Sequence, residues 1–301
     1  MIQNSTLPAL QVIALRYVDT RLAPDDERGI DSFAASGVYE AAGVPVNIVE
    51  PRLPEGDETG DRIVDLGLLN GQIANQVAAG KARGEAVLMT GGNCTHITGV
   101  FGGLQDAYGP GVRVGLVWFD AHGDINTPAI TPSGMLGGMP VAVCAGLAFP
   151  RWRELSHIIA PLPADRIVMV DVRNLDPDEE NLIRTLGIPT VEVAPTGPGT
   201  AFHAAISDLA DRCDMIYLHI DSDILDERYV PDNGTPEPNG PDMDTVLAAV
   251  DEVMATGKVS VLAIVSVNAG GNGRERALAT GTDLIRGALE SWRTYGLPAK
   301  I

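Results

Sequence analysis

Several features that mark other classes of protein are scarce in this sequence of 301 residues. Its three cysteines, Cys94, Cys144 and Cys213, are odd in number and form no Cys-x-x-Cys pair, which argues against a disulfide framework. There are 21 basic against 40 acidic side chains, a formal net charge of −19, so we expect no nucleic-acid partner and no polybasic membrane anchor. No apolar run reaches the ~18 residues that span a bilayer, and the first residues lack a signal-peptide pattern. These absences predict a soluble, reduced, cytoplasmic protein.

Short apolar runs are present along the whole chain and alternate with helical patterns. Apolar residues recur at helical spacing from Ile63 to Val77 and from Met243 to Met254, the second set just after Pro241. We expect an α/β fold with one mainly parallel sheet covered on both faces, in a single domain over residues 1–301. The runs that read as strands buried on both faces are 11–18, 46–50, 86–90, 113–119, 166–172, 190–193, 215–220 and 259–267.

The segment VWFDAHGDINTP carries three metal-ligating side chains at alternate positions directly after an apolar run. They are Asp120, His122 and Asp124. In an extended strand end, residues two apart share a face, so the three side chains can converge on one point. Two carboxylates and an imidazole suit a divalent ion such as manganese. The alternative is a solvated acidic turn.

A second strand ends in the same way, in the segment MIYLHIDSDILD. Asp221 and Asp223 lie two residues apart at its carboxyl end. Two carboxylates placed there without a cation would be costly. The pattern predicts two metal ions bridged by carboxylates from two neighbouring strand ends, which is a way of generating hydroxide at neutral pH.

With the DAHGD and HIDSDILD segments about a hundred residues apart, the sequence resembles the ureohydrolase family of arginases, agmatinases and guanidinobutyrases. The resemblance runs from about residue 10 to about residue 297. It implies a three-layer α/β/α domain with an eight-stranded, mostly parallel sheet. It also implies two divalent ions, normally Mn²⁺, bridged by a hydroxide.

The resemblance implies a set of metal ligands that includes one unusual residue. The segment GGNCTHITG places Cys94 where the family has a histidine. As a thiolate, Cys94 could favour zinc, iron or cobalt over manganese, and the alternative is a small buried thiol. His96 could take its place only with a register shift of two residues, and we expect it in the following helix. The implied ligands are Cys94, Asp120, His122, Asp124, Asp221 and Asp223.

The resemblance also implies an amino-acid substrate. Asn126, Thr131 and Ser133 match residues that bind the α-carboxylate in arginases, although alone they would read as ordinary turn residues. Asp176 matches the direct partner of the α-ammonium group, and Glu179 matches a partner acting through water. The acids around Pro177 would equally suit a helix N-terminus.

Two positions depart from the arginase pattern. Gly137 stands where arginases have a histidine thought to shuttle protons, and Ser266 stands where they have a glutamate that pairs with the guanidinium. Cys94, the LGGM segment that contains Gly137 and the HID strand end before the second acid pair together resemble a divergent branch that includes Nω-hydroxy-L-arginine amidinohydrolases. A hydroxyguanidine is much less basic than a guanidine, so it depends less on a carboxylate at position 266.

Three other histidines carry weaker signals. His157 and His203 sit in helical stretches and read as surface or satisfied core residues. His219 precedes Asp221 by two residues and so can share its face, although the resemblance implies no ligand role for it.

These observations together predict a hydrolase that uses two metal ions to cleave the guanidino (amidino) group of arginine or Nω-hydroxy-arginine. The products would be urea or hydroxyurea plus ornithine, and Asp124 would carry the transferred proton. The alternatives are an agmatinase-, guanidinobutyrase- or formiminoglutamase-type hydrolase, or a non-catalytic subunit with the arginase fold. The resemblance further implies a homo-oligomer, either a trimer or a hexamer.

Overall fold

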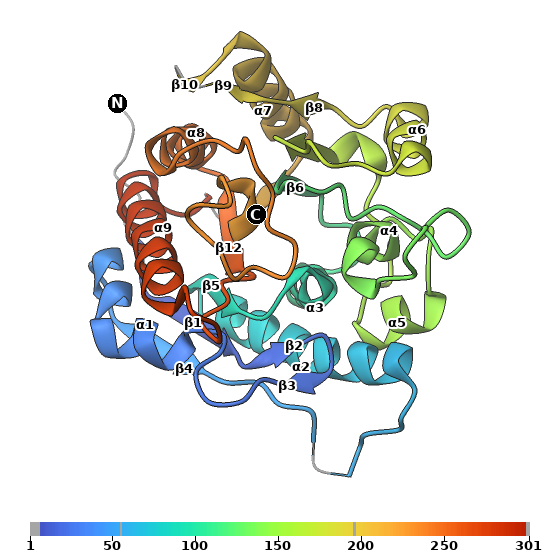
Figure 1. Cartoon of the computed structure of the whole chain (residues 1–301), viewed down its shortest axis with the longest axis horizontal. Helices are drawn as coiled ribbons and strands as arrows, with labels where there is room; N and C mark the ends of the chain where they lie inside the picture. The colour runs from blue at the N-terminus through green and yellow to red at the C-terminus, as the bar shows by residue number, and fades with distance from the viewer. Residues whose placement is uncertain (1–6, 55, 195–196, 299–301) are drawn as a thin grey trace.

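The main sheet of the protein has eight strands, all parallel. The structure, a computed structural model, describes residues 7–54, 56–194 and 197–298. The strand order is β4-β1-β5-β12-β11-β6-β7-β8, and each neighbouring pair is parallel (Figure 1). This confirms the predicted α/β sheet. Its strands are β1 (Leu10–Leu15), β4 (Val46–Val49), β5 (Ala86–Gly91), β6 (Val114–Phe119), β7 (Ile167–Val170), β8 (Thr190–Val191), β11 (Met215–Asp221) and β12 (Val259–Val265).

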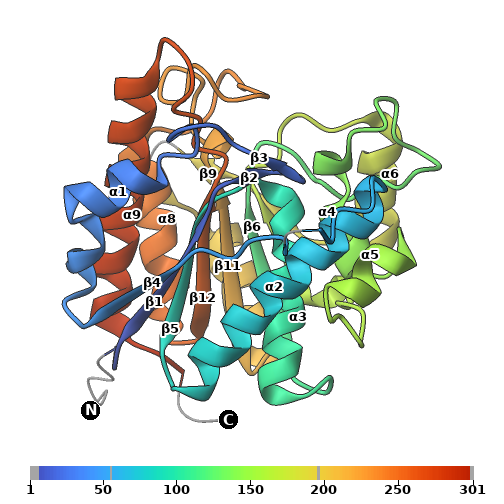
Figure 2. The ribbon, with the colours of Figure 1, turned by 90° about the horizontal axis from the view of Figure 1, so that it is seen from below.

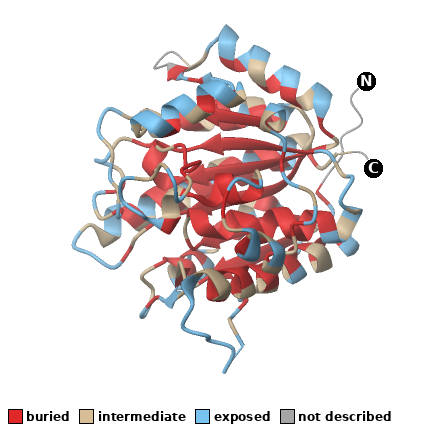
Figure 3. Ribbon diagram, turned by 90° about the vertical axis from the view of Figure 1, so that its right-hand side faces the viewer, coloured by how far each residue is buried: buried red, intermediate tan, exposed pale blue. Residues whose placement is uncertain are grey.

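Helices cover both faces of this sheet, as predicted. One core cluster joins alternate strand residues to α1, α7, α8 and α9, and a second joins the intervening residues to α2, α3, α4 and α5. Figure 2 shows α8 and α9 on one side of the sheet and α2 and α3 on the other, and Figure 3 shows the buried strands between them. The helices are α1 (Ile30–Ser36), α2 (Arg62–Ala82), α3 (Ile97–Tyr108), α4 (Pro140–Cys144), α5 (Pro150–Leu155), α6 (Pro177–Leu186), α7 (Thr200–Arg212), α8 (Met243–Ala255) and α9 (Arg274–Tyr295).

Several predicted strands are shorter than expected, among them those at 166–172 and 259–267, which are strands only over Ile167–Val170 and Val259–Val265. In two others the remainder of the run pairs elsewhere. The ladder between β1 and β5 ends at Leu15 opposite Gly91, so the chain then leaves the sheet. The remainder of the predicted run, β2 (Tyr17–Val18), pairs instead with β3 (Arg21–Leu22) in an antiparallel hairpin. In the same way, β9 (Val193–Ala194) leaves the main sheet to pair with β10 (Gly197–Pro198). Both corrections arise because a strand lasts only as long as its neighbour offers hydrogen-bonding partners.

Two carboxylates hold the start of α2: Asp61 caps the helix by accepting the amides of Ile63 and Val64, and the buried Asp65 in the first turn holds the residues before it. Asp65 accepts hydrogen bonds from the Thr59 amide (2.8 Å), the Thr59 hydroxyl (2.7 Å) and the Gly60 amide (3.2 Å). Burial alone would raise the pKa of Asp65, but these hydrogen bonds outweigh it and hold the pKa below its ordinary value. The chain before α2 is therefore anchored by an ionised side chain.

A glycine allows α3 to approach the chain that follows α5. A Cβ atom at Gly102 would lie 1.7 Å from the carbonyl oxygen of Ser156, which is impossible without moving the backbone. This contact sets the separation of α3 and the segment after α5. In the part of the chain that the structure describes, no helix is both long enough and apolar enough to cross a bilayer.

Candidate metal centre and substrate cleft

A cavity of about 600 Å³ lies at the edge of the sheet where the parallel strands end. In open α/β sheets this edge is the usual place for binding groups. Every site residue predicted from the sequence lines this cavity. The residues are Cys94, Asp120, His122, Asp124, Asn126, Thr131, Ser133, Asp176, Glu179, Asp221, Asp223 and Ser266.

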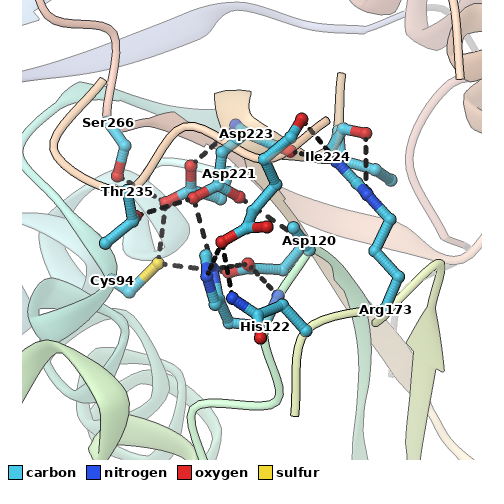
Figure 4. A network of polar contacts seen from close by, with 12 residues as sticks. Cys94, Asp120, His122, Arg173, Asp221, Asp223, Ile224, Thr235 and Ser266 are labelled. Carbon is cyan, nitrogen blue, oxygen red and sulfur yellow. Dashed lines mark hydrogen bonds and ion pairs between the residues drawn. The ribbon is translucent and has the colours of Figure 1, made fainter. Parts of the chain in front are cut away.

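Three strand ends bring a thiol and two carboxylates together. Cys94 begins a single 3-10 turn (Cys94–His96) after β5, Asp120 follows β6, and Asp221 is the last residue of β11. The Cys94 Sγ lies 3.0 Å from Asp221 Oδ2 and 3.5 Å from Asp120 Oδ2. Figure 4 shows these side chains pointing toward one another.

The imidazole of His122 faces a second pair of carboxylates. Its Nδ1 lies 3.3 Å from Asp120 Oδ1 and 3.3 Å from Asp223 Oδ2 (Figure 4). Its Nε2 lies 3.2 Å from Glu237 Oε1, which fixes the ring orientation. Burial lowers the pKa of His122, but the hydrogen bonds with Asp120 and Asp223 outweigh it and raise the pKa to about 12.

The ligand atoms form two groups that share one residue. Cys94, Asp120 and Asp124 have ligand atoms within 4.8 Å of one another, and so do Asp120, His122 and Asp223. A carboxylate has two oxygens and can bridge two ions. The geometry therefore offers places for two cations side by side, with Asp120 between them.

Crowding of buried acids dominates the electrostatics of this cluster. Burial, reinforced by the charge of Asp223, raises the pKa of Asp120 well above its ordinary value and that of Asp221 to about 7. Burial also raises the pKa of Asp124 and of the Cys94 thiol. Divalent cations would reverse this effect, because positive charge favours the ionised carboxylate and thiolate. The donor set therefore fits divalent cations.

The first motif does not converge in the way that the alternation predicted. The ladder between β6 and β11 ends at Phe119, and the chain then turns, with the His122 amide donating to Asp120 Oδ1 (2.7 Å). Asp124 has a left-handed φ of 48°. The predicted extended strand end is thus wrong, and a turn brings Asp120, His122 and Asp124 to the same cavity.

A donor and an acceptor suited to an amino-acid head lie next to each other at one end of the cavity. Asn126 Nδ2 donates to Asp176 Oδ2 (2.9 Å), and the buried Asn126 Oδ1 has no hydrogen-bond partner among the described residues. Glu179, also buried, accepts the amide of Ile125 (3.0 Å). Asn126 retains a second N–H, and Asp176 retains acceptor capacity, so both can meet a ligand.

The loop before α4 supplies hydroxyl groups and open space. Thr131 Oγ1 accepts the Gly134 amide (3.0 Å) and Ser133 Oγ accepts the Met135 amide (3.2 Å). The two hydroxyls lie 3.5 Å apart and one can donate to the other, so at least one keeps a proton for a ligand. A Cβ atom at Gly137 would meet only Met135, at 3.8 Å. The cavity wall can therefore accept a side chain at position 137.

Ser266 directs its hydroxyl to the carboxylate cluster. It follows β12 with a left-handed φ of 61°, and its amide donates to Gly92 O (3.2 Å). Its Oγ donates to Asp221 Oδ2 (Figure 4). Ser266 therefore contacts a predicted metal ligand and also lines the cavity.

His219 is a neighbour of the site to which sequence reasoning gave no role. Its Nε2 lies 3.5 Å from Cys94 Sγ, its Nδ1 lies 3.0 Å from the Tyr217 hydroxyl, and its ring stacks on Trp118 at 4.0 Å between centroids. Burial lowers the pKa of His219 to about 3, so the ring is neutral. The feature of the sequence that could have indicated this place near the site is the position of His219 two residues before Asp221. Glu237, the partner of His122, had no signal of its own, because it comes from a loop.

The remaining histidines lie outside the cluster. His96 belongs to the 3-10 turn rather than to α3, and its Nε2 lies 3.0 Å from the Asp19 carbonyl oxygen, so the helical expectation is wrong. His157 lies in a turn after α5 with a φ of 66°, which also corrects the prediction. His203 lies in α7, as predicted.

The fold and the cavity define a three-layer α/β protein with a cluster of metal-ligating side chains at the carboxyl edge of a parallel sheet. The model of the arginase family matches residues 14–289, and the chain belongs to that family. This confirms the predicted family and the predicted enzyme class. The comparisons do not single out a branch of the family.

Curated relatives match over about two thirds of the chain. The arginase of Bacillus caldovelox is 30% identical over 202 residues, which are 66% of this chain and 67% of that protein. Arginase-1 of Sus scrofa is 34% identical over 210 residues, which are 67% of this chain and 64% of that protein.

Solved structures support the fold over nearly the whole chain. The arginase of Entamoeba histolytica in complex with L-ornithine superposes with a TM-score of 0.82 at 24% identity, covering 95% of this chain and 99% of that one. The formimidoylglutamase of Bacillus subtilis has a TM-score of 0.71 at 15% identity, covering 97% and 89%. At these identities the likeness concerns the fold alone.

Proposed function

We propose that this protein is a hydrolase that uses two divalent metal ions to cleave the guanidino group of an arginine-like amino acid. The substrate is arginine or Nω-hydroxy-arginine, and the products are urea or hydroxyurea plus ornithine. One observation carries this proposal: two ligand groups that share Asp120 lie in the same cavity as the paired Asn126 and Asp176. Membership of the arginase family supports the same reaction class.

The proposed ligands divide between two ions. Cys94, Asp120, Asp124 and Asp221 would hold the first ion, and Asp120, His122, Asp221 and Asp223 would hold the second. Such a pair supplies, when bound, a water of lowered pKa beside a Lewis acid. We propose Mn²⁺ as the native ion, because five of the six ligands are carboxylates or an imidazole, although a thiolate shifts preference toward zinc, iron or cobalt.

The other residues position the substrate and move a proton. Asn126, Thr131 and Ser133 would donate hydrogen bonds to the α-carboxylate, and Asp176 and Glu179 would hold the α-ammonium group, Glu179 through water.

Asp124 would accept a proton from the attacking water and pass it to the departing amine. Ser266 offers a hydroxyl where arginases have a carboxylate. This difference supports a substrate whose guanidino group is less basic than that of arginine, such as Nω-hydroxy-arginine.

A substrate screen tests this proposal. The purified protein is loaded with Mn²⁺, Zn²⁺ or Co²⁺ and incubated with arginine, Nω-hydroxy-arginine, agmatine, guanidinobutyrate and formiminoglutamate. We expect urea or hydroxyurea from the first two only. Release of formamide or ammonia instead, or full activity without metal, would contradict the proposal.

Two variants and a metal analysis complete the test. Asp124→Asn should lose turnover while the protein stays folded, whereas Asp226→Asn, at a loop residue that accepts the Arg228 and Asn239 amides, should stay active. About two equivalents of metal per chain support an enzyme, and none would favour a non-catalytic subunit.

The setting of the protein is also a proposal. We expect it to act in the cytoplasm on a small molecule and to assemble as a trimer or hexamer. Sedimentation velocity checks the assembly, and a monomer at micromolar concentration would contradict it.

A further inference from the structure

Arg28 is a buried cation without a partner in the wall of the cavity. The residue is 5% exposed, and its Nε has no hydrogen-bond partner in the part of the chain that the structure describes. The guanidinium forms no hydrogen bond or ion pair with any described residue. Burial lowers the pKa of Arg28 to about 10, so the group remains charged at neutral pH. Nε is the one guanidinium nitrogen that is fully buried without a partner, so the two terminal nitrogens are open to the cavity and can donate to a ligand.

The neighbouring charges do not satisfy Arg28. The nearest acid along the chain, Glu27, is taken by Arg21, with a shortest distance of 2.7 Å between guanidinium and carboxylate. Asp221 lies close enough to interact electrostatically with Arg28. However, Asp221 makes its hydrogen bonds with Cys94, Ser266 and the Asp223 amide. Arg28 thus retains all its donors.

The main chain fixes Arg28 beside the loop that follows β12. The carbonyl oxygen of Glu27 accepts the amide of Ala269 (2.7 Å). Gly29 has a left-handed φ of 70° directly before α1, and a Cβ there would meet Phe33 and Leu278 at 3.0 Å. Arg28 is therefore held in place by its neighbours on both sides.

The order of the strands places Arg28 at the far end of the cleft from the amino-acid head. The order from one side is β1, β5, β12, β11, β6 and β7. Arg28 follows β1 and lies against the loop after β12, whereas Asn126 follows β6 and Asp176 follows β7. The ligand cluster comes from β5, β6 and β11 between them. A substrate with its head at Asp176 and its reacting carbon at the cluster points its terminal nitrogen toward Arg28.

The acids that line the cavity wall beside Arg28 already have cationic partners, Asp19 in Arg62 and Glu27 in Arg21, so among the described residues Arg28 is the unpaired charge at this far end. Ser266 is neutral there and donates to Asp221, while Arg28 is a cation with free N–H groups. A substrate guanidinium would meet a like charge. A neutral N-hydroxyguanidine instead presents a hydroxyl oxygen, which can accept a hydrogen bond.

We propose that Arg28 donates hydrogen bonds to an oxygen on the terminal guanidino nitrogen and so selects an N-hydroxyguanidine over a guanidinium. This assignment rests on the proposed hydrolase function and names the substrate class within it. Arg28 is then a specificity-determining residue that contacts the substrate.

Kinetics on two substrates test the assignment. Arg28→Met removes the charge and the donors but keeps the length, and Arg52→Met, at an exposed residue outside the cavity, is the matched control. We expect Arg28→Met to lower kcat/KM for Nω-hydroxy-arginine at least about tenfold relative to arginine, the size of one charge-assisted hydrogen bond. The preference of Arg28→Lys for Nω-hydroxy-arginine should lie between those of the wild type and Arg28→Met, because lysine keeps the charge but lacks the planar set of donors of a guanidinium. An equal change on both substrates, with metal content retained, overturns the assignment.

A binding measurement keeps the test independent of turnover. Calorimetry of the Mn²⁺-loaded wild type and of Mn²⁺-loaded Arg28→Met compares N-hydroxyguanidine with guanidinium, fragments that lack the amino-acid head. A preference for N-hydroxyguanidine that the wild type shows and Arg28→Met loses supports the role of Arg28. The same preference in both proteins reflects binding to the metal ions and overturns that role. The two proposals also fail differently. Absence of urea and hydroxyurea from every substrate contradicts the hydrolase, whereas turnover with a preference for arginine contradicts only the role of Arg28.

Discussion

Replacement of Cys94 by alanine should remove one of two metal ions and leave the other. The Cys94 Sγ belongs to the ligand group with Asp120 and Asp124, whereas the group of Asp120, His122 and Asp223 does not contain it. The thiol is buried and lies 3.0 Å from Asp221 Oδ2. An alanine leaves no donor atom at this place, so one ion loses a ligand outright.

The expected loss of metal affinity follows from the effects known for residues that hydrogen-bond a metal ligand without binding the metal themselves. Loss of a residue that only hydrogen-bonds a ligand weakens metal binding by about 10–100-fold. Loss of the ligand itself should reach at least the upper limit, about 100-fold or roughly 2.8 kcal/mol. At metal concentrations that just saturate the wild type, Cys94→Ala should therefore retain one equivalent.

Two measurements check this expectation. Elemental analysis after equilibration with Mn²⁺ gives the stoichiometry. Cobalt loading reports a thiolate ligand directly, because thiolate-to-cobalt charge transfer produces a near-ultraviolet band. We expect that band in the wild type and in Cys213→Ala, which removes a buried thiol that does not line the cavity, but not in Cys94→Ala. Unchanged stoichiometry in Cys94→Ala, with no thiolate band in the wild type, would refute Cys94 as a ligand.

Three further predictions concern stability and the open position in the cleft. The pKa of Asp65 is lower in the folded protein than in the unfolded chain, so the ionised carboxylate stabilises the fold. This contribution should be complete above the unfolded pKa of about 3.9 and should be lost as the pH falls through the folded pKa. In urea unfolding of protein from which metal has been removed with a chelator, Asp65→Asn should thus lower the free energy of unfolding by about 1–3 kcal/mol at pH 7. This difference between wild type and variant should close below about pH 4. A difference that does not depend on pH would contradict the reasoning. Gly137→His should be tolerated and raise kcat on arginine at least about tenfold, since a positioned acid or base contributes about 10²–10⁴-fold; an unchanged kcat would argue against proton transfer from this position. Gly102→Ala should destabilise the fold by about 3 kcal/mol through the clash with Ser156 O, whereas Gly111→Ala, at an exposed turn residue in open space, should change it by less than about 0.5 kcal/mol; similar thermal midpoints for the two variants would refute the clash.

Much of the fold was predictable because the six inner strands of the sheet are buried on both faces. The edge strands β4 and β8 are partly exposed, contrary to the prediction. The eight apolar runs without alternation correspond to the eight strands of the sheet, and the two helical patterns correspond to α2 and α8. Strand ends were less predictable. The run at residues 11–18 is continuous in the sequence, but β1 ends at Leu15 because its partner β5 ends at Gly91. Such a boundary depends on a neighbour that is distant in sequence.

The candidate site divides in the same way. The residue types after two strands, such as Asp120 and Asp223, were sufficient to predict carboxylates gathered at one edge, because parallel strands end at the same edge. The left-handed turn at Asp124 and the contact from Glu237 to His122 could not be predicted from periodicity, since they depend on loops.

The sequence by itself determined the kind of chemistry: buried strands that end in acids, a histidine and a cysteine, and a chain whose motifs resemble the ureohydrolases. Only the tertiary structure decided which charges face one another. Arg28 had no signal in the sequence, because an arginine in a polar turn is normally solvated and paired. Its burial without a partner arises from the packing of its turn against the loop after β12. Sequence thus set the donors, and packing set which of them line the cavity and which lack a partner.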